Sequence, residues 1–418
     1  MVEIAWSRWL RPGDHLVCSH MSAEPTALLA SMAACPDLPQ PLHLMLGVPF
    51  SAAAAQLPPG CELTTYGGMG SAGALAQRRP VQCSPLLYGR AERVYDEGRW
   101  RCDVALVALG RRRDGRLFLA PSHGPALAAA RRARHVIAQV AAGVPCVPGA
   151  EWPQDLPIAA ILETDARPLV LDESEAGDTE RAIAARIAAL VPDGACLQVG
   201  IGALPSAVLA ALASHRHLGV HTGMLTPALW QLVEAGAADH SRKALDRGVA
   251  VTGSICGGPD LYAAVDGHPG VLLREPGYTH DARVIAAQPD MFCLNSALEV
   301  DLLGNANAET IQQADGRWRW VGGVGGLPDF VRAAVQAPRG QSVLALAART
   351  PRGKARIVPR LSGPCTVAAC DADVVVTEHG VARLRDANVG ERVRSMLTLA
   401  DPEDRAGLEA AARASGLL

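Results

Sequence analysis

The chain has 418 residues, a formal net charge of −3, 49% hydrophobic residues and only 4% aromatic residues. This composition excludes a disordered chain and predicts a large core built mainly of Ala, Leu and Val. The weak net charge gives no electrostatic signature of nucleic-acid binding, and the longest basic run, Arg111–Arg113, is typical of a solvated loop. No run of about 18 apolar residues occurs, so we expect no membrane-spanning helix.

The N-terminus and the cysteines indicate the compartment. The first residues, MVEIAWSRWLRPGD, lack the apolar core of a signal peptide. The 11 cysteines are odd in number and scattered, and they include no C-x-x-C pair. We therefore expect reduced thiols in the cytoplasm, without a disulfide framework or a metal site. The absence of H-E-x-x-H, Walker A and G-x-S-x-G motifs argues against zinc proteases, P-loop NTPases and serine hydrolases.

The first elements along the chain contain an internal repeat. Residues 11–30, RPGDHLVCSHMSAEPTALLA, align without a gap with residues 191–210, VPDGACLQVGIGALPSAVLA. Each segment has a turn, a short apolar run, a loop of small residues and a proline that opens an Ala/Leu helix. The pattern predicts a strand, a loop and a helix N-terminus in both segments. We interpret it as a duplication; the alternative is two generic units of similar composition.

The remaining segments continue the alternation of strands and helices. The sequence predicts strands over 102–109, 135–140, 342–348 and 372–377, and helices over 126–134 and 401–417. Acidic residues and turn formers concentrate in the predicted linker 163–180. These elements predict an α/β protein with two domains of similar plan.

Three glycine-rich loops are candidates for ligand contact. They are Gln198–Gly202, Gly322–Gly326 and Gly68–Gly73. In open parallel sheets ligands bind beyond the carboxyl ends of the strands, and glycine lets backbone N–H groups approach a ligand closely. The third loop matches G-x-G-x-x-G, but no clear apolar strand precedes it, so a nicotinamide cofactor is disfavoured. Together the loops favour a ligand that carries a phosphate or a thioester.

Ordered motifs over nearly the whole chain resemble the acetyl-CoA hydrolase/CoA-transferase family. This family comprises class I CoA-transferases, among them 4-hydroxybutyrate and acetate CoA-transferases. The motifs that carry the resemblance are LQVGIGALPSAV (197–208), LGVHTGM (218–224), LNSALEVDLLGNANAET (294–310), GGVGGLPDF (322–330) and VVVTEHGVARLR (374–385), with SHMSAEPTALL (19–29), GRWRCDVALV (98–107) and ARHVIAQV (133–140) in the first half.

The resemblance implies a fold, a substrate and an assembly. The fold would be two similar open α/β domains, 1–175 and 176–418, with the active site between them. Coenzyme A would enter as the acyl-CoA substrate, and relatives are commonly homodimers or larger. Known members use a glutamate that attacks the acyl-CoA and passes through an enzyme glutamyl-CoA thioester, a form of covalent catalysis.

The resemblance also assigns roles to individual residues. The segment that reads His-Thr-Glu-Met in the family is His221-Thr222-Gly223-Met224 here, so glycine stands at the nucleophile position. By resemblance, Gln198, Gly200 and Gly202 belong to a loop that binds the oxyanion and the substrate, and Asn295 lies beside the thioester. Gly325 and Gly326 match a loop that receives coenzyme A, and Glu378 matches a glutamate near the coenzyme A entrance.

Glycine at position 223 leaves the route of catalysis open. An acceptor or water could attack the thioester directly, with His221 as general base. Another residue could replace the glutamate, and the candidates are Glu378, Glu309, Cys256 and His221. The sequence around Glu309 is typical of a solvated loop acid. The family activity, transfer of coenzyme A between carboxylic acids, could also be retained by a mechanism that the sequence does not identify. Finally, the chain could be a non-catalytic acyl-CoA-binding paralogue or partner subunit.

We therefore predict an acyl-CoA-dependent transferase that works without the glutamyl-CoA intermediate. Its partners would be an acyl-CoA and a small-molecule acceptor, with no nucleic acid and no membrane, in a cytoplasmic homo-oligomer. Acyl-CoA hydrolysis differs from this reaction only in the acceptor, which would be water.

Overall fold

The computed structural model describes residues 4–171 and 175–418. Its contacts divide the chain into two compact units. Unit 1 comprises Met1–Asp172, Gly223–Pro227 and Val251–Thr279, and unit 2 comprises Glu173–Thr222, Ala228–Ala250 and His280–Leu418. Part of the predicted linker 163–180, residues 172–174, lies outside the described residues. The predicted domain limits, 1–175 and 176–418, stay a prediction.

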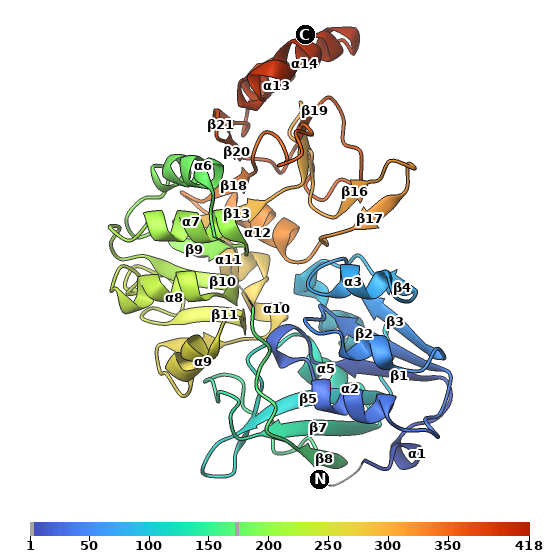
Figure 1. Cartoon of the computed structure of the whole chain (residues 1–418). Helices are drawn as coiled ribbons and strands as arrows, with labels where there is room; N and C mark the ends of the chain where they lie inside the picture. Colours follow the sequence, from blue (N-terminus) through green and yellow to red (C-terminus); the bar gives the residue numbers. More distant parts are fainter. Residues whose placement is uncertain (1–3, 172–174) are drawn as a thin grey trace. The chain divides into compact units, whose positions relative to one another are not determined.

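The first sheet has the order β4-β3-β2-β1-β5-β7-β8 and is parallel, with β6 antiparallel to β5 (Figure 1). Its strands are β1 (Asp14–Cys18), β2 (Leu42–Gly47), β3 (Cys61–Thr65), β4 (Val81–Cys83), β5 (Val104–Arg111), β6 (Leu117–Leu119), β7 (His135–Ala141) and β8 (Ala160–Glu163). The α-helices of the first 172 residues are α1 (Trp6–Trp9), α2 (Thr26–Ala33), α3 (Ala72–Ala76), α4 (Arg93–Asp96) and α5 (Ala126–Arg132).

The second sheet has the order β12-β11-β10-β9-β13-β18-β20-β21. Its strands are β9 (Cys196–Val199), β10 (Gly219–Leu225), β11 (Ala250–Ile255), β12 (Val271–Leu273), β13 (Met291–Ser296), β18 (Gln341–Ala345), β20 (Val374–Thr377) and β21 (Gly380–Arg383). Two small sheets contain β14 (Glu299–Asp301), β15 (Ala306–Asn307) and β19 (Ile357–Val358), and β16 (Thr310–Gln312) and β17 (Trp318–Trp320).

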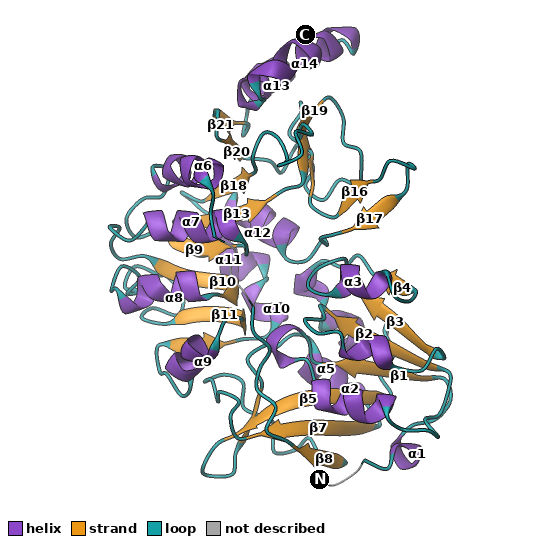
Figure 2. Cartoon of the chain, in the orientation of Figure 1, coloured by secondary structure: helices purple, strands orange, loops and turns teal. Residues whose placement is uncertain are grey.

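Helices follow most strands of the second half, as Figure 2 shows. They are α6 (Asp178–Ala188), α7 (Ala203–Ala211), α8 (Pro227–Glu234), α9 (Pro259–Val265), α10 (Pro276–Thr279), α11 (Ala282–Ala286), α12 (Leu327–Ala334), α13 (Val389–Leu399) and α14 (Pro402–Ala414). The alternation of strand and helix confirms the predicted α/β class with parallel sheets.

The repeated sequence segments form matching units. Residues 11–30 contain β1 and the start of α2, and residues 191–210 contain β9 and most of α7. Each strand lies in the interior of its sheet, β1 between β2 and β5 and β9 between β10 and β13. The two sheet orders correspond strand for strand from β4 to β8 and from β12 to β20. The shared topology supports the duplication.

Most predicted elements are confirmed, with small shifts at their ends. The strand predicted over 102–109 is β5, which begins at Val104; the carboxylate of the preceding Asp103 accepts the His15 N–H over 2.8 Å. All but the last residue of β5 are buried, as expected for a central parallel strand. A strand does precede the loop Gly68–Gly73, since β3 ends at Thr65. Its polar and apolar residues alternate, so it is not the apolar run that the dinucleotide motif requires, as the sequence indicated.

Candidate active site

Two amide side chains pair across neighbouring strands of the second sheet. Gln198 on β9 lies opposite Cys293 on β13, and Asn295 lies two residues further along β13, so both amides project from the same face. The Gln198 Nε2 donates to the Asn295 Oδ1 over 3.1 Å, and the Asn295 Nδ2 donates to the Gln198 Oε1 over 3.0 Å. Both residues are buried. Each amide keeps one further N–H and one oxygen lone pair for a ligand.

The loop after β9 passes directly beside this amide pair. The Gly200 N–H donates to the Leu294 carbonyl over 2.9 Å, and a Cβ on Gly200 would lie 3.7 Å from the Asn295 Oδ1. Gly202 has a φ of +116°, a conformation that side chains disfavour. Helix α7 begins at the next residue, so its first N–H groups lack intrahelical acceptors and favour negative charge. The predicted oxyanion and substrate loop therefore lies at the amide pair.

A histidine lies beside Gln198 on the other neighbouring strand. Val220 on β10 is opposite Leu197 on β9, so His221 follows in register with Gln198. The His221 side chain is completely buried. The same alternation places position 223 on the face of β10 that carries His221, and Gly223 itself is half-buried. Gln198, Asn295 and His221 thus come together at three adjacent strands.

A second histidine, His280, approaches the glycine-rich loop 322–326. A Cβ on Gly326 would collide with the His280 ring, and a Cβ on Gly322 would collide with the Ala308 carbonyl. The His280 ring also packs edge-on against Phe330, with ring centroids 4.8 Å apart. Burial, and then the charge of His221, lowers the pKa of His280 to about 3, so its imidazole is neutral at pH 7. The loop is therefore glycine-rich partly because buried groups approach it closely.

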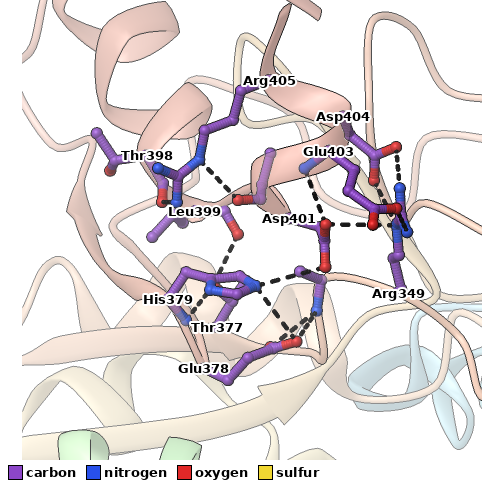
Figure 3. Close-up of polar contacts among 12 residues, drawn as sticks. Arg349, Thr377, Glu378, His379, Thr398, Leu399, Asp401, Glu403, Asp404 and Arg405 are labelled. Carbon is purple, nitrogen blue, oxygen red and sulfur yellow. Dashed lines mark hydrogen bonds and ion pairs between the residues drawn. The ribbon is translucent and has the colours of Figure 1, made fainter.

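Glu378 lies in a different part of the same sheet edge. It follows β20, which is three strand spacings from β9, or about 14 Å. Its carboxylate accepts the Ala348 N–H over 2.9 and 3.1 Å. Figure 3 shows the His379 ring between Glu378 and Asp401, with its Nε2 3.8 and 3.9 Å from their carboxylates. The structure therefore does not bring Glu378 to the amide pair.

Comparison with known proteins identifies the relatives of this fold. A family model, the acetyl-CoA hydrolase/transferase C-terminal domain, matches residues 257–412. The 4-hydroxybutyrate coenzyme A transferase of Clostridium kluyveri is 32% identical over 329 residues, which cover 78% of this chain and 76% of the relative.

The chain belongs to the acetyl-CoA hydrolase/transferase family. The predicted family, and the prediction of an enzyme of the CoA-transferase class, are thereby confirmed. The crystal structure of RipA from Yersinia pestis matches this member of the family with a TM-score of 0.89 and 29% identity, over 98% of this chain and 96% of that one. A 4-hydroxybutyrate CoA-transferase from Porphyromonas gingivalis matches with a TM-score of 0.81 and 27% identity, over 98% and 95% of the two chains.

Two other side chains were candidates to replace the family glutamate. Cys256 is completely buried, its Sγ lies 3.8 Å from the Ser22 Oγ, and burial raises its pKa to about 12, so it is not a thiolate at pH 7. The prediction that Glu309 is a solvated loop acid was wrong. It is only 4% exposed, and its carboxylate accepts the Thr366 hydroxyl over 2.8 Å. In this family member both groups are held in structural contacts.

Sequence reasoning missed His280 and the packing role of Phe330. Nothing in the local sequence around His280 marks it, and the fold alone brings it to His221 and Gly326. No helix among the described residues is long and apolar enough to cross a membrane. Within residues 4–171 and 175–418, no group of three His, Cys, Asp or Glu side chains could hold a metal ion.

Proposed function

We propose that this protein is an acyl-CoA-dependent transferase in which an acceptor attacks the bound thioester directly. One observation carries the proposal: the buried Gln198–Asn295 pair stands beside an open glycine loop in a family member whose nucleophile position, 223, is glycine. Relatives of the chain carry the names of CoA transferases, which supports acyl-CoA as the substrate. Glycine can neither attack a carbonyl nor hold an acyl group.

The amide pair and the loop after β9 would stabilise the transition state. Attack on a thioester carbonyl places a negative charge on its oxygen. The free N–H groups of Gln198 and Asn295 and the N-terminus of α7 are donors already held in place by the sheet. Donors fixed before the reaction lower the barrier because they need no reorganisation, and one such donor is typically worth about 10²–10³ in rate.

The reaction needs no nucleophile from the enzyme. An acceptor oxygen or nitrogen forms a bond to the thioester carbon, the carbon–sulfur bond breaks, and coenzyme A leaves as the thiolate. The acceptor's proton passes to His221 as general base and then to the departing sulfur. The products are the acylated acceptor and free coenzyme A. With water as the acceptor, the product is the free acid.

Two other activities remain candidates. One is the transfer of coenzyme A to a carboxylate, the activity that the names of several relatives give for those proteins. It requires the thiolate to return and attack the activated acceptor. A non-catalytic acyl-CoA-binding subunit would retain the pocket without turnover. The contacts of Cys256, Glu309 and Glu378 disfavour a replacement nucleophile.

Mass spectrometry of the purified protein with mixed short and branched acyl-CoAs distinguishes these activities. Carboxylate, amine and hydroxyl acceptors are added separately. An ester or amide product supports direct acyl transfer, a free acid indicates hydrolysis, and a new CoA ester indicates CoA transfer. An acyl or glutamyl-CoA adduct on the protein would contradict direct attack. Retained coenzyme A binding without turnover would identify a non-catalytic subunit.

A glutamate restored at position 223 tests the glycine directly. We expect Gly223→Glu to gain acetate-dependent CoA transfer, because the new carboxylate would share the face of β10 that carries His221. Gly223→Gln is the matched control, since it adds the same volume without a nucleophilic oxygen anion. Equal activity in the two variants would show that the pocket serves another reaction.

The proposal includes a homodimer in the cytoplasm. The cysteines are all free in the structure, which is compatible with a reducing compartment. Light scattering of the purified protein measures the assembly.

A further inference from the structure

The segment that follows β18 concentrates positive charge. Residues 349–360 read RTPRGKARIVPR and contain five basic side chains and no acidic one: Arg349, Arg352, Lys354, Arg356 and Arg360. The whole chain is slightly acidic, with a net charge of −3, so this density is local. We call residues 349–360 the basic hairpin, because Arg349 bridges Ala355 in an antiparallel pair.

Two of the five side chains fasten the hairpin to unit 2. Arg349 pairs with Glu403 and Asp404 in the first turn of α14 (Figure 3). The nitrogen–oxygen distances are 2.6 Å to Glu403 and 2.7 Å to Asp404. Arg356 donates to the Leu298 carbonyl over 2.8 Å and to the Ala297 carbonyl. Burial lowers the pKa of Arg356 from its ordinary value. These two charges are therefore used inside the fold.

The other three basic side chains lie at the surface. Arg352, Lys354 and Arg360 are exposed, and none forms an ion pair with the residues that the structure describes. The tip that carries the first two is a closed turn, since the Thr350 N–H donates to the Lys354 carbonyl over 2.8 Å and Gly353 adopts a φ of +77°. The closed turn fixes the backbone of the tip, so Arg352 and Lys354 are presented together at the surface.

The base of the hairpin is joined to the residues around the amide pair. It leaves the carboxyl end of β18, which lies next to β13 and Asn295. Arg356 binds the carbonyls of the two residues that follow β13, and Glu378 accepts the Ala348 N–H at the entry to the hairpin. The free charges and the amide pair are thus held by one continuous hydrogen-bonded framework within unit 2.

We propose that Arg352, Lys354 and Arg360 bind the phosphate groups of the acyl-CoA, an inference that rests on the proposed function. Coenzyme A carries its thioester at one end of the pantetheine arm and its phosphates at the other. When the thioester lies at Gln198 and Asn295, the phosphates lie a pantetheine length away, and the basic hairpin on the same sheet edge would neutralise their charge. Guanidinium and ammonium groups are the usual partners of phosphate.

The matching loop of the first sheet lacks this charge. β7 corresponds to β18 in sheet order, and residues 142–159 after β7 contain no Lys or Arg, and two acids, Glu151 and Asp155. The duplicated plan therefore does not require cations at this place. They are particular to the unit that carries the amide pair.

A charge-reversal variant tests the proposal with two substrates. The double variant Arg352→Glu/Lys354→Glu is compared with the unaltered protein on an acyl-CoA and on the matching acyl-pantetheine, which lacks the phosphates. We expect KM for acyl-CoA to rise on the order of tenfold at low salt, with kcat unchanged and KM for acyl-pantetheine unchanged. The dissociation constant of coenzyme A, from calorimetry, should rise by the same factor.

The control reverses two charges at the opposite edge of the sheet. Arg216 and Arg242 are exposed, and both contact Gly194 before the amino end of β9. Arg216→Glu/Arg242→Glu should leave every constant unchanged. Equal changes on both substrates, or no change on either, would overturn the proposal. If the unaltered protein turns over neither thioester, the proposed function fails. The phosphate site is then judged by coenzyme A binding alone, and an unchanged dissociation constant in Arg352→Glu/Lys354→Glu would overturn it.

Discussion

The two sheets share a strand order but carry different side chains at equivalent places. The repeat aligns Cys18 on β1 with Gln198 on β9, and the pairing register then aligns Ala108 on β5 with Asn295 on β13. An apolar thiol and a methyl group thus stand where unit 2 holds two paired amides. The same register aligns Leu46 with His221. The strand order is the same in both units, whereas at these three aligned positions the polar side chains occur in the second sheet and apolar ones in the first.

The loops before α5 and α12 show the same contrast. Gly124 and Gly325 each precede the helix by two residues, with φ values of +49° and +52°. The two residues before Gly124 are Ser122 and His123, both buried, whereas Gly323 and Val324 precede Gly325. Two buried polar side chains thus precede the glycine of the first turn, whereas a glycine and a valine precede that of the second. The two units share a backbone plan and differ in the side chains that it carries.

The largest expected effect comes from the amide pair. Asn295→Leu should lower kcat/KM on the order of 10²–10³-fold, because it removes an oxyanion donor and the partner of Gln198. It should also lower the free energy of unfolding by about 1–3 kcal/mol, since one buried amide is left unsatisfied. Steady-state kinetics and urea unfolding measure the two effects.

The double variant Gln198→Leu/Asn295→Leu separates these effects. Replacing both partners removes the unsatisfied amide, so stability should return toward the original value while activity stays lost. Cys18→Ala, at the equivalent place in the first sheet, should leave kcat/KM unchanged. A loss of activity in Cys18→Ala equal to that in Asn295→Leu would remove the distinction between the sheets.

The next effect is a loss of stability in acid that both units share. Burial lowers the pKa of His20 in unit 1 to about 4 and of His280 in unit 2 to about 3. The unfolded chain therefore binds more protons than the folded one below about pH 6.5, so stability is complete above that pH and falls as the pH decreases. Each histidine should cost about 2 kcal/mol at pH 5.

Chemical unfolding between pH 7 and pH 5 checks this sign in each unit. His20→Gln and His280→Gln should each flatten the pH dependence, since glutamine does not titrate. A protein that becomes more stable as the pH falls would contradict the assignment.

A smaller difference should separate the two equivalent turn glycines. Gly124→Ala forces a side chain into a positive φ and also against the His20 ring, whereas Gly325→Ala meets only the unfavourable φ, with no atom within 4 Å. We expect Gly325→Ala to cost about 1–2 kcal/mol and Gly124→Ala to cost more. Urea unfolding midpoints should rank the variants in that order, and the reverse order would refute the comparison.

The smallest effect is expected in α14, which follows the last strand of the second sheet. Gly407 lies inside this helix, and a Cβ there meets no atom within 4 Å. Gly407→Ala should therefore stabilise the protein by about 0.5–1 kcal/mol without changing kcat or KM. A thermal unfolding scan checks the first effect, and destabilisation would show that the helix end packs differently.

The strands and the duplication could be predicted because their signals are local. Apolar runs and turn residues mark β5, β7 and β20, and the gapless repeat marks β1 and β9. The prediction of a solvated loop for Arg111–Arg113 was only partly right: Arg111 ends β5, and Arg112 and Arg113 lie in the turn that follows, where Arg112 pairs with Asp114. The resemblance supplied Gln198 and Asn295 individually. Their pairing depends on the register of strands almost a hundred residues apart, which no local pattern encodes.

Other parts of the candidate site depend wholly on tertiary packing. His280 fits beside position 326 because that residue is glycine, and the buried Glu309 accepts a hydrogen bond from Thr366, 57 residues further along the chain. The basic hairpin was overlooked because its charges are interspersed with other residues, and only the ion pairs show which of them stay free. The sequence thus predicted that the candidate site lies at the carboxyl ends of the strands of the second sheet, but not which side chains contact one another there.

The uneven burial of the thiols gives the protein a natural reporter position. Of the free cysteines, only Cys365 and Cys370 are exposed, and both lie in the segment before β20 that also carries Thr366, the donor to Glu309. The cysteines buried in the two sheets have raised pKa values, as for Cys196 and Cys256, both at about 12. Burial also raises the pKa of Cys365, and Cys35 and Cys83 are half-buried. A brief reaction with a fluorescent maleimide should therefore mark the exposed Cys370 first, and its emission would follow ligand binding in the unmutated chain.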